Sequence, residues 1–304
     1  MCLIAWNWQP GSATPLLLVA NRDEFYARPT APLSWWADAP ILAGRDLQAG
    51  GTWLGVSRSG RLAALTNHRD PARRRADAPS RGELVSAFLQ SDTSARDHLD
   101  ALAASAASYN PFNLLVFDGQ TLMGLESRHA KVVALQPGLG AVSNADFLTP
   151  WPKLTLLKNS LQALLAQAHP SDAQLLDLLH QRGLAADSDL PATGIPLELE
   201  RALSSAFIAT PGYGTRACSV VRFEAGRVQF LEQSFDATGC IGTQHVAAEL
   251  PRAMPDTGQQ QANIHVQNKA TAQTFPAQDA TQTIANTSPP PTPSDPTCPP
   301  TSRS

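Results

Sequence analysis

The chain opens with Met1-Cys2-Leu3-Ile4-Ala5-Trp6, an apolar run that predicts a buried strand and places a cysteine directly after the initiator methionine. Cells normally remove this methionine when the next side chain is small, as that of cysteine is. Removal would leave the α-amine of Cys2, with a pKa of about 7.7–8.0, beside a thiol with a pKa of about 8.5. Such an amine can act as the base that activates a nucleophile on its own residue. The alternative is that Cys2 is a small apolar residue at the start of a buried strand.

The order of apolar patterns along the chain predicts an α+β domain. Short apolar runs bounded by turn residues predict strands at 2–8, 16–20, 52–57, 62–66, 113–117, around Val132, around Val142, at 218–223 and at 228–235. Helical spacing of apolar residues predicts helices at 82–90, 94–107, 153–168 and 173–182, the last ended by Gly183. The last two strands are expected to close the domain as a hairpin. Strands at both ends with helices between them favour sheets that are covered by helices.

Composition excludes several classes of protein. The 304 residues carry a net charge of −3, so no basic surface for nucleic acid is expected. No apolar run approaches the roughly 20 residues that a membrane-spanning helix needs, and the first charged residue is Arg22, so neither a transmembrane segment nor a signal peptide is expected. The four cysteines are widely separated, which predicts neither a disulfide framework nor a zinc ribbon. No metal or required cofactor is expected, and a reducing cytoplasm fits an exposed thiol best.

The chain changes character near Pro251. Beyond it, glutamine, threonine, alanine, serine and proline dominate. Such a segment has too little apolar surface to offset the entropy lost on ordering. We therefore predict a working domain at 1–250 and a disordered tail at 251–304. A scaffold that acts through this tail is a third functional hypothesis, with no partner identified.

Polar side chains follow the predicted strand at 16–20. The segment Asn21-Arg22-Asp23-Glu24 places three charged residues directly after it. A neighbouring cation favours a thiolate, and a neighbouring carboxylate favours the ammonium form of an α-amine. These residues could therefore hold the ionic groups of Cys2 in place. A solvated turn is the alternative.

Two asparagines end later strands in the same way. Asn67 is followed by His68 and Arg69, and Asn144 follows the strand around Val142. The oxyanion that forms in acyl transfer needs donors such as asparagine amides or backbone N–H groups. Asn67 and Asn144 are the candidates for this role, although each is also a common turn residue.

One set of motifs runs in order through residues 1–235: MCLIAW, NRDEFYARP, AGRD with GGTWLGV, TNHR, SRGELV, YNPFNLLVFD, VSNADFLTPWPK and YGTRACSVV. Together they resemble the NRDE family, whose animal members are called transport and Golgi organisation protein 2. An ordered series of this length is far more specific than any single match. The predicted tail has no counterpart in the resemblance.

This family is similar in turn to N-terminal nucleophile hydrolases of the conjugated bile acid hydrolase and penicillin V acylase type. The resemblance implies a four-layer αββα sandwich with the nucleophile on the first strand. It implies six catalytic positions: Cys2, Arg22, Asp23, Asn67, Asn144 and Arg216. In the hydrolases two residues separate the arginine from the aspartate, whereas here they are adjacent. Successive strand side chains point to opposite faces, so Asn21 or Glu24 could take one of these two roles.

Two functions follow from the resemblance. The first is hydrolysis of a non-peptide C–N bond, or a related acyl bond, of a small molecule, with substrate contacts from Asn21, Glu24, Trp53, His68 and Arg69. The second is binding without cleavage, because the family is associated with haem trafficking and with lipid or acyl-coenzyme A metabolism. Under this alternative, Cys2 is a candidate haem ligand and His68 a second one.

Overall fold

The structure is a computed structural model that describes residues 2–167 and 170–251. The tail predicted at 251–304 lies outside the described residues except for Pro251. Within the described part of the chain, no helix is long and apolar enough to cross a membrane.

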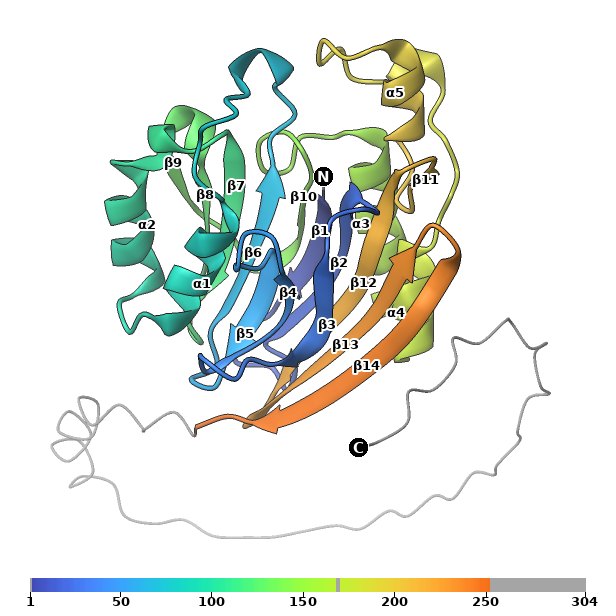
Figure 1. Cartoon of the computed structure of the whole chain (residues 1–304). Coiled ribbons are helices and arrows are strands. Elements are labelled where there is room, and N and C mark those ends of the chain that lie inside the picture. Colours follow the sequence, from blue (N-terminus) through green and yellow to red (C-terminus); the bar gives the residue numbers. More distant parts are fainter. Residues whose placement is uncertain (1, 168–169, 252–304) are drawn as a thin grey trace, which may run out of the picture. The chain divides into compact units, whose positions relative to one another are not determined.

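Two antiparallel sheets form the centre of the domain (Figure 1). The first sheet has the order β10-β1-β2-β12-β13-β14, with β11 paired to β12: β10 Gly138–Val142, β1 Cys2–Trp8, β2 Leu16–Phe25, β12 Tyr213–Glu224, β13 Arg227–Asp236, β14 Gly239–Glu249 and β11 Ala209–Thr210. The second has the order β3 to β9: β3 Thr30–Trp35, β4 Ile41–Asp46, β5 Leu54–Ser57, β6 Leu62–Asn67, β7 Phe112–Phe117, β8 Leu122–Glu126 and β9 Lys131–Ala134.

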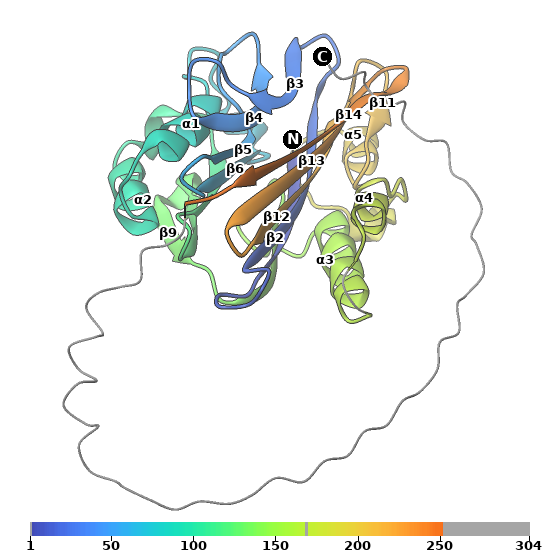
Figure 2. The same ribbon diagram turned by 90° about the horizontal axis from the view of Figure 1, so that it is seen from below.

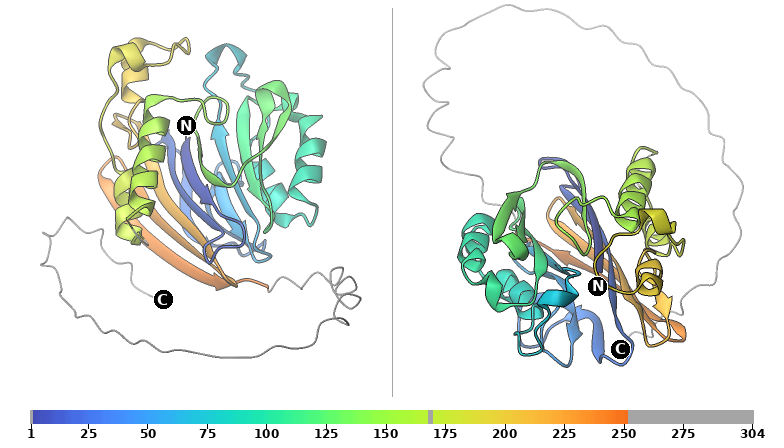
Figure 3. Two further views of the ribbon diagram at one scale, coloured as in Figure 1. Left: turned by 180° about the vertical axis from the view of Figure 1, so that it is seen from behind. Right: turned by 90° about the horizontal axis from the view of Figure 1, so that it is seen from above.

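Helices cover the outer face of each sheet, as the views in Figures 2 and 3 show. The helices α1 (Gly82–Gln90) and α2 (Ala95–Ala103) pack on the second sheet. The helices α3 (Pro152–Leu165) and α4 (Asp172–Leu179) pack on the first. A short helix, α5 (Leu197–Ala202), precedes β11. The four layers are therefore helix, sheet, sheet, helix, which confirms the predicted αββα sandwich.

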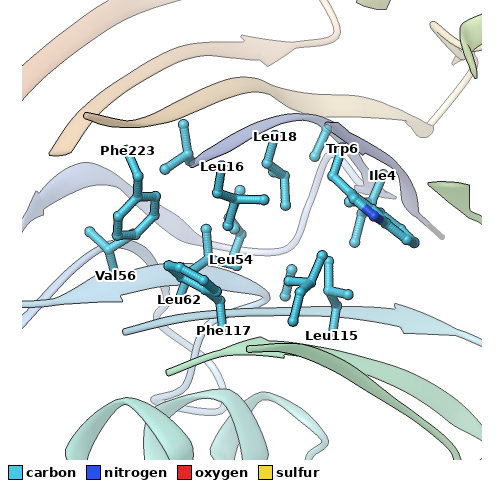
Figure 4. Packing of buried hydrophobic residues seen from close by; sticks show 14 of the residues in the cluster. Ile4, Trp6, Leu16, Leu18, Leu54, Val56, Leu62, Leu115, Phe117 and Phe223 are labelled. Carbon is cyan, nitrogen blue, oxygen red and sulfur yellow. The ribbon is translucent and has the colours of Figure 1, made fainter. Parts of the chain in front are cut away.

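The alternation of side chains along β1 explains how the layers assemble. Ile4 and Trp6 point toward the second sheet and join the core between the sheets (Figure 4). Leu3 and Ala5 point the other way and pack against α3 and α4. Both faces of β1 are buried, so its sequence is a continuous apolar run rather than an alternating one. By the same alternation, Cys2 belongs to the face between the sheets.

The helix predicted at 173–182 ends earlier than expected. A capping box of Ser171 and Gln174 starts α4, but its last residue is Leu179. The carbonyl of Leu179 accepts a hydrogen bond from the side chain of Asn21, which satisfies one of the groups left free at a helix end. The prediction that Gly183 ends this helix was therefore wrong.

The predicted closing hairpin is also incomplete, because β14 follows β13 and pairs along its full length. Its sequence, GCIGTQHVAAE, is polar and mostly exposed or half-buried, which suits an edge strand and leaves little apolar signal. The strands β3, β4 and β8 were not predicted either. A bulge between Ala31 and Ser34 interrupts β3, so no regular alternation marks it.

Candidate active site

The ends of four strands meet at one edge of the first sheet. Antiparallel pairing places Cys2 opposite Arg22 and Ile4 opposite Val142. Asp23 lies opposite Thr215 on β12. The polar residues at the end of β2 and directly after β10 therefore lie beside the start of β1, where Figure 1 shows the strand ends.

A cavity of about 370 Å³ opens at this edge. It brings together six of the residues predicted from sequence: Cys2, Arg22, Asp23, Glu24, Trp53 and Asn67. The second sheet contributes to the same wall, because Asn67 is the last residue of β6 and Gly44 belongs to β4. The cavity therefore lies between the sheets, and both sheets are needed to form it.

Cys2 is 5% exposed and lines this cavity. Burial raises its pKa above the ordinary value, and the charge of Asp23 acts in the same direction. The charge of Arg22 and a hydrogen bond from the Asp23 backbone lower it. Because burial is the largest effect, Cys2 is a neutral thiol near pH 7, and its attack on an acyl carbon needs a base.

Arg22 and Asp23 both line the cavity although they are adjacent in sequence. A bulge in β12, between Thr215 and Ala217, lies opposite this pair and interrupts the register there. Arg22 faces Glu24, with 3.9 Å between Nη2 and Oε2. Asp23 accepts a hydrogen bond from Thr215 Oγ1 at 2.8 Å.

Lys153 is a charged residue beside this site that sequence reasoning missed. It lies in the first turn of α3, is 2% exposed, and its Nζ makes no hydrogen bond to a described residue. Burial lowers its pKa to about 8, and the charge of Asp23 is the strongest influence in the other direction. Burial likewise raises the pKa of Asp23, and Lys153 is the strongest influence that lowers it. Both residues are buried, and the charge of each favours the charged form of the other.

Glu232 is a second residue that was not predicted. It lies on β13, is 3% exposed, and lines the cavity. Its Oε1 accepts a hydrogen bond from the backbone N–H of Leu33 at 3.1 Å, and its Oε2 accepts one from Ser219 at 3.2 Å. Burial raises its pKa to about 7, and the charge of Arg22 opposes the rise.

Three predicted residues direct their side chains to the backbone. Asn21 donates to the carbonyls of Leu179 and Ala206 on the helix side of the first sheet. Asn144 donates to the carbonyl of Asn67 at 2.8 Å. Arg216 is the third, and none of these three residues lines the cavity.

Arg216, the third of them, is the extra residue of the β12 bulge. Its Nη1 donates to the carbonyls of Phe25, Tyr26 and Arg28, and its Nε donates to that of Phe235. It therefore clamps the turn that follows β2.

His68 and Arg69 also lie outside the cavity lining. The Nε2 of His68 is 3.6 Å from Asp146 Oδ1. Arg69 forms a buried ion pair with Glu200 and stacks over the ring of Trp151. In the described part of the chain, no group of three or more histidine, cysteine, aspartate or glutamate side chains is placed to hold a metal ion.

Residues 1–237 match the model of the family described as Transport and Golgi organisation 2. The chain belongs to this family. It is 36% identical over 263 residues to the mouse Transport and Golgi organization 2 homolog, an alignment that covers 77% of this chain and 93% of the mouse protein. The human Transport and Golgi organization protein 2 homolog is 36% identical over 261 residues, with the same coverage of 77% and 93%. The Drosophila melanogaster Transport and Golgi organization protein 2 is 28% identical over 270 residues and covers 77% of this chain and 92% of its own length.

Solved structures of two hydrolases are also similar to this member of the Transport and Golgi organisation 2 family. A Caenorhabditis elegans N-acylethanolamine-hydrolyzing acid amidase ortholog has a TM-score of 0.41 and 10% identity, and covers 72% of this chain and 92% of its own. The C2A mutant of the conjugated bile acid hydrolase from Clostridium perfringens has a TM-score of 0.40 and 10% identity, and covers 82% and 92%. At such low values, the functional proposal depends on the residues of this chain.

Proposed function

We propose that this protein is an N-terminal cysteine hydrolase that cleaves an amide, or a related acyl bond, of a small molecule. The observation that carries the proposal is the placement of Cys2 in the wall of a cavity that also holds Arg22, Asp23 and Asn67. A nucleophile, charged groups that tune it and an amide donor share one pocket. The proposed reaction needs no cofactor.

The reaction begins with removal of Met1, which frees the α-amine of Cys2. This amine takes the thiol proton while the sulfur attacks the acyl carbon and forms a tetrahedral intermediate. The C–N bond then breaks, and the proton passes from the ammonium group to the leaving amine. Water hydrolyses the resulting thioester, which releases the acid and restores the thiol.

Asp23 and Asn67 support this reaction in different ways. The carboxylate form of Asp23, which the charge of Lys153 favours against the effect of burial, would favour the ammonium form of the α-amine after proton transfer. Asn67 lines the cavity, and its side-chain amide is the donor that we assign to the oxyanion. Asn144 fixes the position of Asn67 through the hydrogen bond to its carbonyl. Arg216 fixes the turn after β2 and acts on the site through it.

The proposal is tested by replacing Cys2 with alanine and assaying a panel of fluorogenic acyl amides. We expect Cys2→Ala to lower kcat/KM by a factor on the order of 10³ or more, because no other group replaces the nucleophile. Its circular dichroism spectrum should remain that of the wild type. Cys218→Ala is the matched control, because Cys218 is also a buried free thiol but packs on the helix side of the first sheet. A folded Cys2→Ala protein with full activity would refute the proposal.

Binding without cleavage stays a prediction, with haem, a lipid or an acyl-coenzyme A as the ligand. His68, the second haem ligand expected from sequence, is not part of the cavity lining among the described residues. A haem titration followed by absorbance tests this alternative, which requires a spectral change that depends on Cys2. Either activity needs a reduced thiol, so we place the protein in the cytoplasm.

A further inference from the structure

The arginines that line the cavity differ in how their charge is matched. There are four of them: Arg22, Arg28, Arg45 and Arg81. Arg28 pairs with Asp46 at 2.7 Å. Arg45 makes two parallel hydrogen bonds of 2.8 Å to Asp38. Arg22 faces Glu24, as described above.

Arg81 is the exception. Among residues 2–167 and 170–251, no carboxylate lies within ion-pair distance of it. It is half-buried, and Nη1 donates to the carbonyl of Pro111 at 3.0 Å, which uses one of its five donors. Burial lowers the pKa of Arg81, and the thiolate form of Cys2 and the charge of Glu24 are the strongest influences in the other direction. The guanidinium group therefore belongs to a residue that lines the same cavity as Cys2, and it has no carboxylate partner among the described residues.

Two glycines bring Arg81 to this position. It directly precedes α1, and a Cβ atom on Gly51 would lie 2.5 Å from the carbonyl carbon of Gly82. Only a glycine allows the loop before β5 to approach the start of α1 so closely. The backbone N–H of Thr52 donates to the Gly82 carbonyl at 3.3 Å and holds the two segments together.

The carboxylates in the cavity wall leave this cation unneutralised. Asp46 and Glu24 belong to the arginine pairs described above. The charge of Lys153 acts on Asp23, and burial raises the pKa of Glu232 to about 7. A partly buried guanidinium with no counter-ion is costly, and an anion from a ligand would offset this cost through charge-assisted hydrogen bonds.

We propose that Arg81 binds an anionic group of the ligand, a carboxylate or a phosphate, while the acyl carbon of that ligand faces Cys2. This inference rests on the proposed function, because it names the class of substrate for the same cavity. The planar fork of a guanidinium matches the two oxygens of either anion. Arg81 is therefore a specificity-determining residue, and neutral acyl amides are poor substrates.

Alkylation of Cys2 by two reagents that differ in charge tests the inference. Iodoacetate and iodoacetamide carry the same reacting carbon, but only iodoacetate is an anion. Their rate constants at Cys2 are measured at one pH by peptide mass spectrometry. We expect Arg81→Gln to lower the ratio of the iodoacetate rate constant to the iodoacetamide rate constant about tenfold, as the loss of one charge-assisted contact implies. Arg45→Gln is the matched control, because Arg45 lines the same cavity but already has a partner, and its ratio of rates should equal that of the wild type. An equal change with both reagents in Arg81→Gln, or no change in the ratio, overturns the inference.

A second measurement keeps the test valid if Arg81→Gln does not fold or if Cys2 reacts slowly. The melting temperature of the wild type is measured in acetate, in inorganic phosphate and in chloride at equal ionic strength. Because such salts also stabilise proteins generally, the rise over chloride is compared with that of Arg81→Lys; we expect a larger rise in the wild type, and an equal rise in the two proteins overturns the inference. Arg81→Lys should keep part of the shift. The same melting temperature in all three salts for the wild type overturns the inference.

Failure of the inference can be told apart from failure of the proposed function. If alkylation depends on Arg81 and on the charge of the reagent but no substrate is hydrolysed, the anion site stands and the proposed catalysis is refuted. If anionic and neutral acyl amides are hydrolysed with equal kcat/KM, the proposed catalysis stands and the role of Arg81 is refuted.

Discussion

Lys153 is buried, and its Nζ makes no hydrogen bond to a described residue. Few lysines in proteins are buried in this way. The pKa of Lys153, lowered by burial to about 8 from an ordinary 10.5, shows that the folded state disfavours the ammonium form. The cost is full at pH values below about 8 and declines as the pH rises toward the ordinary value. A shift of this size corresponds to about 3 kcal/mol.

We therefore expect Lys153→Met to unfold at higher urea concentration than the wild type at pH 7. The gain in the free energy of unfolding is at most about 3 kcal/mol, because Asp23 loses its strongest favourable charge in the same variant. The gain should shrink as the pH is raised above 8. Lys158→Met, on the same helix, is the control and should have little effect at any pH. A Lys153→Met protein less stable than the wild type at pH 7 would show that the ammonium group stabilises the fold.

Residues that tertiary packing buries were harder to predict than those in motifs. Cys2, Arg22, Asp23 and Asn67 stand in motifs, and the structure brings all four to one cavity. Lys153 stands in a motif too, but we interpreted it only as a helix start. Its spacing of four and eight residues from Leu157 and Leu161 places it on the buried face of α3, so the signal was present. Glu232 was marked by its alternation with Val228 and Phe230, which face the same core.

At the scale of elements, the close contact between β1 and β10 depends on a glycine. Gly140 lies opposite Trp6, and a Cβ atom added to it would lie 2.3 Å from the indole ring. We expect Gly140→Ala to lower the free energy of unfolding by about 1–3 kcal/mol, because the ring or the strand must move. Since β10 leads directly to Asn144, the variant should also lower kcat.

Chemical denaturation measures this effect against Gly183→Ala. A Cβ atom on Gly183 meets nothing within 4 Å, so that variant should be at least as stable as the wild type. Equal stability of the two variants would mean that the indole ring of Trp6 does not restrict β10.

Prediction of elements was best where one pattern dominated. The helix at 82–90 and the strand at 2–8 were predicted with the bounds of α1 and β1. The strand predicted at 16–20 extends to Phe25, because buried polar residues, Asn21 to Asp23, continue it beyond the apolar run. A local sequence pattern cannot predict such buried polar residues, because their burial is stabilised by partners far away in the sequence.

At the scale of the molecule, the cavity exists because two sheets stack with the start of β1 near the end of β6. Cys2 and Arg22 come from the first sheet, and Asn67 and Trp53 come from the second sheet and the segment that precedes β5. Sequence patterns predicted sheets covered by helices and the polar strand ends, whereas the order of the four layers was implied by the resemblance to a known family. The resemblance to a known family, rather than periodicity, predicted that those ends would meet.

The central claim is that a free α-amine and a thiol share residue 2 within this cavity. Intact mass spectrometry of the protein purified from cells tests it most directly. The account predicts a mass lower than that of the full chain by one methionine residue, with Cys2 at the new amino terminus. A mass that retains Met1 would contradict it, because the nitrogen of Cys2 would then be part of a peptide bond and could not accept the proton.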